Sequence, residues 1–585
     1  MDRPCPLQPS LSPDDGTGQS RQADHNGASG LVRRVIASPP FHQDAIDRGL
    51  ALLAAGRTED ALRILSREAR NNRLDGDAQH AYGLALHKAT RYDEAVEQFQ
   101  RADRLKPNRW PVYQNLSAAY HGLMDYEAAY TAAERCLELN PGNTAALNHL
   151  ADLHLIWGEM DEAVNLYERV IEADPLNNEA HVGVLFGLDL IPGVSPEQAL
   201  EARRRYARVF EAVGQRFRRP HTNTPDPERK LRIGYLSGDF RDHTAAYMWG
   251  PMYEYHDRDR FEVYSYADMD KADELSEWFR QQSNGWRAFR NIPPEQVAWA
   301  IREDAIDVLI DTAGYTNGGH LRVFAMKPAP LQVQAFGYLT GSGLSTMDAV
   351  LVDDVLVPPE HEGHFTERPL RVPYALGFGG LNGTVPITPK PESTPLTFGH
   401  LGRSDKASQQ AIDLWARVLR AYPGSRMLLK DRGLRMDRTR DRIVRWFAEA
   451  GIGSERLDLR GITSREEHLL TYNEVDVILD SVPQGGGTTT IEAIFMGTPV
   501  VTLLGPRIIG RIAATTLHEV GRSDWVAADE DAYIRLAGEA IGQGGAHLRM
   551  AVEASAVFDG AARTRAFEEA IRGLWRSRCR EQGAT

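Results

Sequence analysis

A glycine- and threonine-rich segment, DSVPQGGGTTTIEAIF, combines residue types that suit the binding of an anion. A predicted strand ends at Asp480, three glycines follow it, and Thr488 and Thr489 begin a predicted helix. Glycine lets the backbone approach a ligand closely, and the N–H groups at a helix start attract negative charge. We therefore expect Gly487 and the two threonines to bind a diphosphate, although a structural turn with a threonine N-cap has the same pattern. Glu492 then falls in the first turn of the helix, where its carboxylate can accept hydrogen bonds from ribose hydroxyls.

A second candidate lies upstream in ITSREEHLLTYNEVDVILD, where Ser464 and Glu467 form the capping box of a predicted helix. Arg465, His468 and Tyr472 are spaced i, i+3 and i+7, so they share one face of that helix. Arg465 can contact a phosphate, and His468 can stack on or hydrogen-bond to a nucleobase or sugar. Taken alone, a histidine at such a position is more often a surface residue.

Two further segments place charged residues after predicted strand ends. In HLGRSDKASQQAIDLW, Arg403 and Lys406 precede a helix at the end of the sheet where α/β proteins bind ligands, so they can neutralise a pyrophosphate. A solvated loop is an equal alternative there. In GDFRDHTAAYMWGP, His243 follows the first predicted strand and can transfer a proton or hold a substrate, since histidine titrates near neutral pH.

The first third of the chain carries a repeat of 34 residues. Similar turns end at Pro107, Pro141 and Pro175. A small residue recurs at the same spacing, which indicates close helix crossings at Ala61, Ala95, Ala129 and Ala163. The pattern predicts four tetratricopeptide repeats over about residues 42–185, the first degenerate because Arg73 replaces the proline. Such helix pairs stack into an α-solenoid whose groove normally holds a peptide or protein, so we expect a protein partner there.

From residue 231 onward, short β-branched runs alternate with helical stretches, as in the βαβ units of a parallel sheet. Five runs are predicted strands in each half, and the proline-rich stretch PITPKPESTP separates the halves. Two doubly wound, Rossmann-like α/β lobes suggest a ligand between them, beyond the carboxyl ends of strands. The predicted organisation is a disordered tail (1–38), tetratricopeptide repeats (39–190), a helical linker (191–228), a first lobe (229–390) and a second lobe (391–580).

The composition narrows the class of protein. The chain has 585 residues and a formal net charge of −14, so nucleic acid and anionic membranes are poor default partners. Three widely spaced cysteines exclude a disulfide framework or a CxxC metal site. The sequence has no GxGxxG, GxxxxGK[ST] or HExxH motif and no long apolar segment. This disfavours a Rossmann dehydrogenase, a P-loop ATPase, a metal-dependent enzyme and a transmembrane protein, and we expect a cytoplasmic location.

Downstream of the repeats, distinctive motifs occur in a fixed order: GYLSGDFRDHTAAY, DTAGYTNGG, KPAPLQVQAFGY, GSGLSTMDAVLVD, REEHLLTYNEVDVILD, GGGTTTIEAIFMGTPVVT and GRIAA. Together with the preceding repeats, they resemble the O-linked N-acetylglucosamine transferase, or SPINDLY-like, family over about residues 230–575. The resemblance implies a GT-B fold and the inverting transfer of a sugar from a nucleotide donor to Ser/Thr hydroxyls of proteins. It also implies that the reaction needs neither a metal nor another cofactor.

The resemblance also implies roles for individual residues. By position, Lys406 matches the lysine that neutralises the donor diphosphate, and Arg403 lies at a polar donor-site position three residues earlier. His243 matches the histidine assigned to catalysis in the first lobe. The second lobe is expected to bind the nucleotide sugar through Thr463, Ser464, Arg465, His468, Gly487, Thr488, Thr489 and Glu492.

Departures from the family pattern bear on the donor sugar. Gly487 stands where animal members have a histidine, and Thr471 where they have an arginine. The resemblance makes UDP-N-acetylglucosamine the leading candidate. The departures leave an alternative, which is GDP-fucose or a nine-carbon nonulosonic acid donor of the kind that bacterial relatives use on flagellin. A non-catalytic tetratricopeptide scaffold is disfavoured because Lys406 and both threonines are present. A small-molecule glycosyltransferase is disfavoured by the repeats, since a small acceptor needs no peptide groove.

Overall fold

A computed structural model describes residues 40–583 except 270, 317, 380, 382–384 and 392, so the predicted tail over residues 1–38 lies outside the described residues. The described residues fall into two compact units, one ending at Leu153 and the other beginning at His154. The boundary lies inside helix α7 (Thr144–Trp157), earlier than the predicted end of the repeats at residue 190. None of the helices in the described ranges has the length and apolar character needed to span a membrane.

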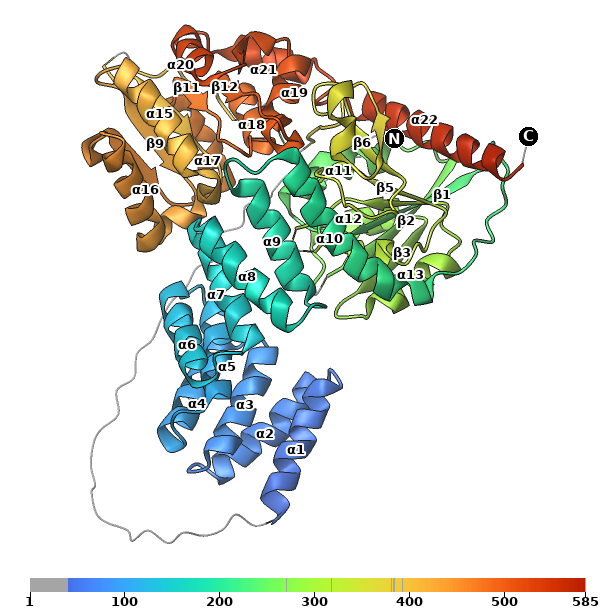
Figure 1. Cartoon of the computed structure of the whole chain (residues 1–585), viewed down its shortest axis with the longest axis vertical. Coiled ribbons are helices and arrows are strands. Elements are labelled where there is room, and N and C mark those ends of the chain that lie inside the picture. The colour runs from blue at the N-terminus through green and yellow to red at the C-terminus, as the bar shows by residue number, and fades with distance from the viewer. Residues whose placement is uncertain are drawn as a thin grey trace. The chain divides into compact units, whose positions relative to one another are not determined.

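The first unit is built from consecutive helices, as the 34-residue period predicts, and its first six helices pack each against the next (Figure 1). Ala61, Ala95 and Ala129 are fully buried, which agrees with their predicted place at helix crossings. The helices are α1 (Pro40–Ala54), α2 (Thr58–Asn71), α3 (Gly76–Lys88), α4 (Tyr92–Leu105), α5 (Trp110–Gly122), α6 (Tyr126–Leu139) and α7.

The second unit begins with the last predicted repeat. Its helices are α8 (Met160–Ala173), in which Ala163 is fully buried, and α9 (Asn178–Leu190). They are followed by α10 (Pro196–Gly214), which starts with a capping box between Ser195 and Gln198. This helix occupies half of the predicted linker, and it packs against α9. The end of the repeat array is therefore part of the same compact unit as the two lobes.

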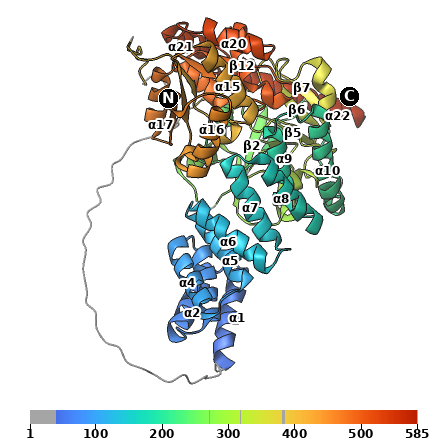
Figure 2. The same ribbon diagram turned by 60° about the vertical axis from the view of Figure 1, so that its left-hand side comes forward.

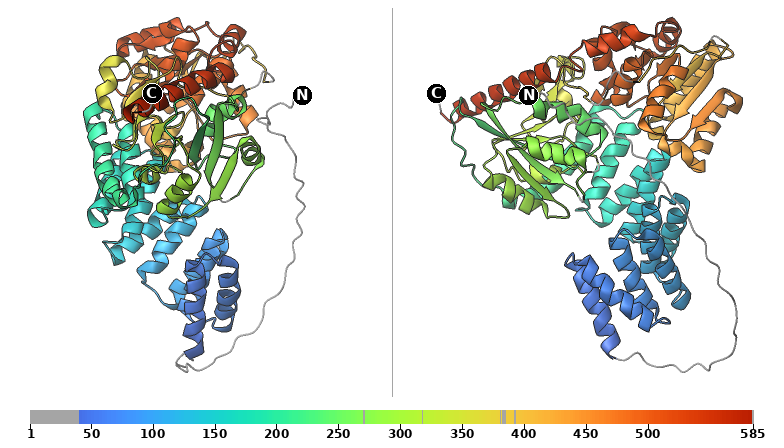
Figure 3. Two further views of the ribbon diagram at one scale, coloured as in Figure 1. Left: turned by 90° about the vertical axis from the view of Figure 1, so that its right-hand side faces the viewer. Right: turned by 180° about the vertical axis from the view of Figure 1, so that it is seen from behind.

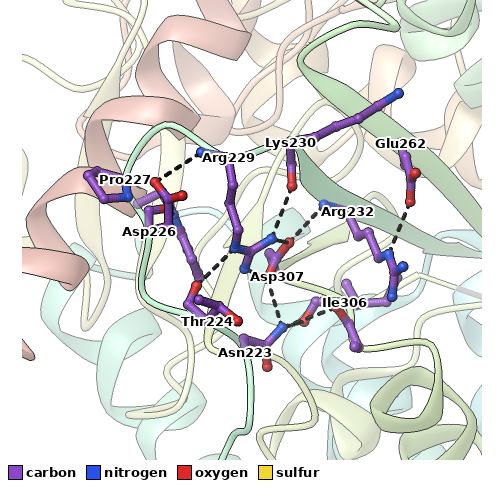
Figure 4. A network of polar contacts seen from close by, with 12 residues as sticks. Asn223, Thr224, Asp226, Pro227, Arg229, Lys230, Arg232, Glu262, Ile306 and Asp307 are labelled. Atoms are coloured by element: carbon purple, nitrogen blue, oxygen red, sulfur yellow. Dashed lines mark hydrogen bonds and ion pairs between the residues drawn. The ribbon is translucent and has the colours of Figure 1, made fainter. Parts of the chain in front are cut away.

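Residues 218–230, which include the end of the predicted linker (191–228), form a strap fixed to the first lobe. Asp307 is fully buried at the start of β4, and its carboxylate accepts hydrogen bonds from three residues (Figure 4). Asn223 Nδ2 donates at 2.7 Å, Arg229 Nη1 at 2.8 Å, and the backbone N–H of Arg232 at 2.8 Å. A buried carboxylate needs such donors, so the strap and the sheet stabilise one another.

The first lobe contains a seven-stranded parallel sheet in the order β3-β2-β1-β4-β5-β6-β7. Its strands are β1 (Leu231–Ser237), β2 (Phe261–Asp268), β3 (Gly285–Phe289), β4 (Val308–Asp311), β5 (Leu331–Gln334), β6 (Ala349–Val352) and β7 (Arg368–Arg371). Its helices are α11 (Thr244–Tyr255), α12 (Glu274–Gln282), α13 (Pro294–Glu303) and α14 (Leu321–Phe324). The five predicted strands are all present. The two missed strands, β3 and β7, are the edge strands, and neither has the buried apolar run that marks a central strand.

The second lobe contains a six-stranded parallel sheet in the order β10-β9-β8-β11-β12-β13. Figure 2 labels β12 of this sheet among the lobe's helices. Its strands are β8 (Thr397–His400), β9 (Arg426–Lys430), β10 (Leu457–Arg460), β11 (Val477–Leu479), β12 (Val500–Leu503) and β13 (Val526–Ala527). Its helices are α15 (Gln409–Ala421), α16 (Asp437–Glu449), α17 (Arg465–Thr471), α18 (Thr488–Phe495), α19 (Ile512–Glu519), α20 (Glu530–Glu539) and α21 (Ala546–Glu553). Of these strands, only the two-residue β13 was not predicted.

The last helix, α22 (Gly560–Glu581), returns to the first lobe, whereas the sequence analysis placed it in the second. It packs against α11 and lies beside the first lobe in Figures 1 and 3. Glu568 accepts a hydrogen bond from the fully buried His256 at 2.8 Å. Arg572 and Trp575 donate to backbone carbonyls of the strap. The predicted second lobe therefore contains a helix that completes the first.

One buried carboxylate, Asp189 at the end of α9, joins the last repeat to both lobes. Arg203 of α10 donates to both of its oxygens at 2.8 Å. Tyr338 of the first lobe donates to Oδ2 at 2.9 Å, and Arg507 of the second lobe donates to Oδ1 at 3.3 Å. Arg507 also donates to the carbonyl of Leu188 at 2.9 Å. This cluster, the Asp189 junction, ties three separate parts of the unit to a single side chain.

Candidate functional site

A cleft of about 650 Å³ lies between the two lobes. From the first lobe it is lined by His243, Thr244, Met248, Gly337, Leu339, Leu356 and Leu376. From the second lobe it is lined mainly by residues that follow β8, β9, β10 and β11, which include Arg403, Lys406, Thr463, Arg465, His468, Gly487, Thr488, Thr489 and Glu492. The location beyond the carboxyl ends of parallel strands agrees with the expectation from the sequence.

Lys406 lies in the short turn η3 (Ser404–Lys406), between β8 and α15. Its Nζ donates to the carbonyl of Gly485 at 2.9 Å, so the side chain points toward the glycine-rich loop. Burial, together with the neighbouring Arg403 guanidinium, lowers the pKa of Lys406 to about 8. A bound anion would favour the charged ammonium, because an opposite charge nearby raises the pKa of an amine. Lys406 is therefore placed to neutralise a phosphate in the cleft.

The glycine-rich loop is held in shape by Asp480, which follows β11 and is 3% exposed. Its Oδ1 accepts from the backbone N–H of Gly486 at 2.7 Å, and its Oδ2 accepts from Thr502 Oγ1 at 2.7 Å. A Cβ on Gly485 would lie 2.8 Å from the same carboxylate, which leaves no room for a side chain. The need for glycine at this position therefore comes from the packing of the loop itself.

The start of α18 faces the cleft with two threonines. Gly487 is the N-cap of this helix, and Thr488 and Thr489 are its first two residues and line the cleft. Backbone N–H groups at a helix start have no partners within the helix, so they can donate to an anion. A Cβ on Gly487 would meet only Ile512, at 3.4 Å, so this glycine leaves space that a side chain could fill.

Glu492 connects three residues that the sequence placed on one helix face. It lies in the second turn of α18, rather than in the first turn as expected, and it is 2% exposed. Arg465 Nη1 donates to Oε1 at 2.5 Å, while His468 Nε2 and the Tyr472 hydroxyl lie 3.4 and 3.3 Å from Oε2. Burial alone would raise the pKa of Glu492, but the hydrogen bond with His468 and the charge of Arg465 lower it. Glu492 therefore orients Arg465 and His468 at the cleft.

His243 is the N-cap of α11, and its side chain is 42% exposed at the cleft. Its Nδ1 lies 3.2 Å from Asp239 Oδ1 and 3.3 Å from the backbone nitrogen of Ala245. Burial raises the pKa of the Asp239 carboxyl above its usual value, although the charge of His243 opposes this rise. A carboxylate beside one ring nitrogen fixes the orientation of the imidazole. The pair is suited to proton transfer at the cleft.

Of the residues selected from the sequence, Ser464 alone is not among those lining the cleft. Its hydroxyl accepts from the backbone N–H of Glu467 and completes the predicted capping box, so it shapes the start of α17. Sequence reasoning missed three charged residues that line the cleft at the end of β9 and just beyond it, namely Lys430, Asp431 and Arg432. The sequence LLKDRG could have identified them, because it places charged residues at the end of a buried strand. It also missed Phe186 of α9, whose ring lies 5.1 Å from the Arg403 guanidinium.

Two Rossmann-like lobes around a shared cleft, preceded by tetratricopeptide helices, define a repeat-fused protein of the GT-B class. Residues 206–379 and 395–560 match the sequence profile of glycosyl transferase family 41, and residues 46–109 and 123–183 match tetratricopeptide repeat profiles. The chain belongs to glycosyl transferase family 41.

Individual relatives agree with this membership. A protein of Petunia hybrida named "Probable UDP-N-acetylglucosamine--peptide N-acetylglucosaminyltransferase SPINDLY" is 31% identical over 423 residues, which are 70% of this chain and 45% of that protein. The protein of the same name from Arabidopsis thaliana is 30% identical over 435 residues, 70% of this chain and 46% of that protein. The chain thus spans about half the length of these relatives. A solved structure of a Thermobaculum terrenum O-GlcNAc transferase mutant has a TM-score of 0.73 and 27% identity, with 92% of this chain and 98% of that chain covered.

Proposed function

We propose that the protein is an O-glycosyltransferase that transfers a sugar from a nucleotide donor to Ser/Thr hydroxyls of a protein acceptor. The observation that carries the proposal is the convergence of Lys406 and the start of α18 on one cleft, opposite the Asp239–His243 pair. Cationic and N–H donors on one side suit a diphosphate, and a proton acceptor on the other suits an attacking hydroxyl. Family membership and the relatives' names support the same reaction class.

In the proposed reaction, the acceptor hydroxyl attacks the anomeric carbon of the donor sugar. The bond from this carbon to the diphosphate oxygen breaks, and the nucleoside diphosphate leaves with the electron pair. Lys406 and the N–H groups at Thr488 and Thr489 stabilise the negative charge that develops on the leaving group. His243 accepts the hydroxyl proton, with Asp239 stabilising the resulting imidazolium. Attack from the face opposite the leaving group inverts the anomeric configuration.

The donor is proposed to be UDP-N-acetylglucosamine, with GDP-fucose or a nonulosonic acid donor as the alternative. Arg465 and His468 supply contacts for the nucleoside, and the open space at Gly487 removes a side chain that animal members place near the donor. We expect hydrolysis and transfer with one donor class from a panel of nucleotide sugars. Absence of turnover with every donor would favour a non-catalytic scaffold.

We further propose that the reaction needs no metal, since Lys406 and the helix N–H groups would neutralise the diphosphate. Activity should therefore persist in excess EDTA.

The repeats are proposed to hold the protein acceptor, and a deletion tests this role. Removing residues 40–153 should strongly depress transfer to a protein acceptor while sparing slow hydrolysis of the donor, because every residue that lines the cleft follows residue 153. The deletion must stop there, since residues 154–190 pack in the same unit as the lobes. The truncated chain must first be shown to be monodisperse. If it then glycosylates its acceptor as fast as the full chain, the repeats do not select the acceptor.

A further inference from the structure

The four repeat turns share an uncommon backbone conformation. The residue two positions before the start of each second helix has a positive φ at a spacing of 34 residues, at Gly56 (+72°), Thr90 (+59°), Met124 (+60°) and Gly158 (+79°). Two of the four positions carry an ordinary side chain, so the backbone conformation of this turn does not by itself demand glycine. A different reason must therefore be sought for the glycine in each of the other two turns.

Gly158 is distinguished by what lies against it. A Cβ on Gly158 would lie 2.4 Å from Nη2 of Arg442, a residue of α16 in the second lobe, whereas a Cβ on Gly56 would have nothing within 4 Å. The neighbouring residues of the turn contact the same helix, because Glu159 accepts two hydrogen bonds from Arg438, at 2.9 and 2.7 Å. The Arg438 guanidinium also lies 4.0 Å above the ring of Trp157. The α7–α8 turn is therefore docked on α16.

Arg442 carries this contact to the loop that holds Lys406. The side chain is 3% exposed, and it donates from Nη2 to the carbonyl of Ser404 at 3.1 Å and from Nη1 to the carbonyl of Ala407 at 3.2 Å. Those two carbonyls bracket Lys406 in the chain. A guanidinium presents its N–H donors in a fixed planar fork, so two carbonyls bound to it are held at a fixed separation.

We propose that Arg442 is a positioning residue that fixes the Lys406 loop, and that the glycine at position 158 is needed to let Arg442 reach it. The last repeat turn would then set the geometry of the donor-phosphate site without touching the donor. The inference rests on the proposed function, since Lys406 must meet the diphosphate for its position to matter. It assigns a role to the end of the repeat array that is distinct from acceptor binding.

A double-mutant cycle in the full-length chain tests the proposal. Arg442→Met should lower kcat/KM for the donor by on the order of 10²-fold, the loss expected when a reacting group is displaced by about 1 Å. In a Lys406→Ala background the same substitution should cost less than about 3-fold, because the group it positions is already gone. Binding of UDP and of GDP, measured by calorimetry, should show the same non-additivity. Arg445→Met, on the exposed face of the same helix, is the matched control and should change neither quantity.

Gly158→Ala provides a second variant that leaves Arg442 in place. It should weaken nucleotide binding about 10-fold or more, because the added methyl group displaces the Arg442 guanidinium. The effect should be smaller than that of Arg442→Met, which removes the guanidinium altogether. Gly56→Ala is the matched control, because Gly56 also has a positive φ but a Cβ there would have no atom within 4 Å. This variant should bind nucleotide normally. Equal losses from Arg442→Met with and without Lys406, or normal binding by Gly158→Ala, would overturn the positioning role. A wild-type chain that binds neither nucleotide would instead refute the proposed donor site itself.

Discussion

Lys406→Ala is expected to lower turnover of the nucleotide-sugar donor by about 10²–10³-fold, the effect of deleting one preorganised electrostatic stabiliser. The wild-type ammonium is aimed at the glycine-rich loop through its contact with Gly485, so the charge that develops on the leaving diphosphate would lie near it. The measurement is steady-state donor hydrolysis and transfer, with thermal unfolding recorded in parallel. Near-normal turnover in a folded variant would refute the assignment of Lys406.

The pH dependence of nucleotide binding gives an independent check of the same residue. Because the pKa of Lys406 is about 8 in the free protein, the amine is mostly neutral above that pH. A bound diphosphate raises this pKa, so binding above pH 8 should take up a proton and should weaken as the pH rises further. Calorimetry in buffers of different ionisation enthalpy measures the uptake. Lys406→Ala should abolish it, whereas Lys230→Ala, at an exposed position of the strap, should preserve it.

Asp189→Ala is expected to destabilise the lobe-containing unit by about 3–5 kcal/mol, the cost of removing one partner from a buried ion pair. The substitution leaves the guanidinium of Arg203 without its carboxylate and removes acceptors from Tyr338 and Arg507. Thermal unfolding followed by calorimetry should show a lower transition for this unit. Asp161→Ala, at an exposed position of α8, is the control and should have little effect. A variant as stable as the wild type would show that the junction contributes nothing net.

The sequence predicted the parts of the fold that depend on local periodicity. The 34-residue spacing of Ala61 and its counterparts identified the helix pairs, because close helix crossings require small residues at fixed intervals. Several central strands were found because they are buried on both faces and read as apolar runs, as in DVLIDT and PVVTLLG. Strand β13 was missed because two residues give no periodic signal. The return of α22 was missed because its amphipathic pattern shows that one face is buried but not which sheet buries it.

The same limit applied to the candidate site. Lys406, Thr488 and His243 could be selected because each follows a strand end, and strand ends of a parallel sheet meet at one edge. Arg442 and Glu492 act on the site across the fold. Arg442 donates to the carbonyls that bracket Lys406, and Glu492 contacts Arg465 and His468 of another helix. Glu492 shows the difference most clearly. Its sequence position suggested a ribose contact, but its carboxylate already holds Arg465 and His468.

The return of α22 to the first lobe also affects how the protein can be made. The first lobe's strands leave the ribosome well before residues 560–581, and at about 5–20 residues per second the delay is on the order of 10 s or longer. During that interval His256 lacks Glu568, and Phe336 lacks Phe567, whose ring lies 5.1 Å away in the finished structure. The second lobe can complete its core while the first still exposes apolar surface to solvent. Shortening α22 should therefore convert this transient exposure of apolar surface during synthesis into a permanent one.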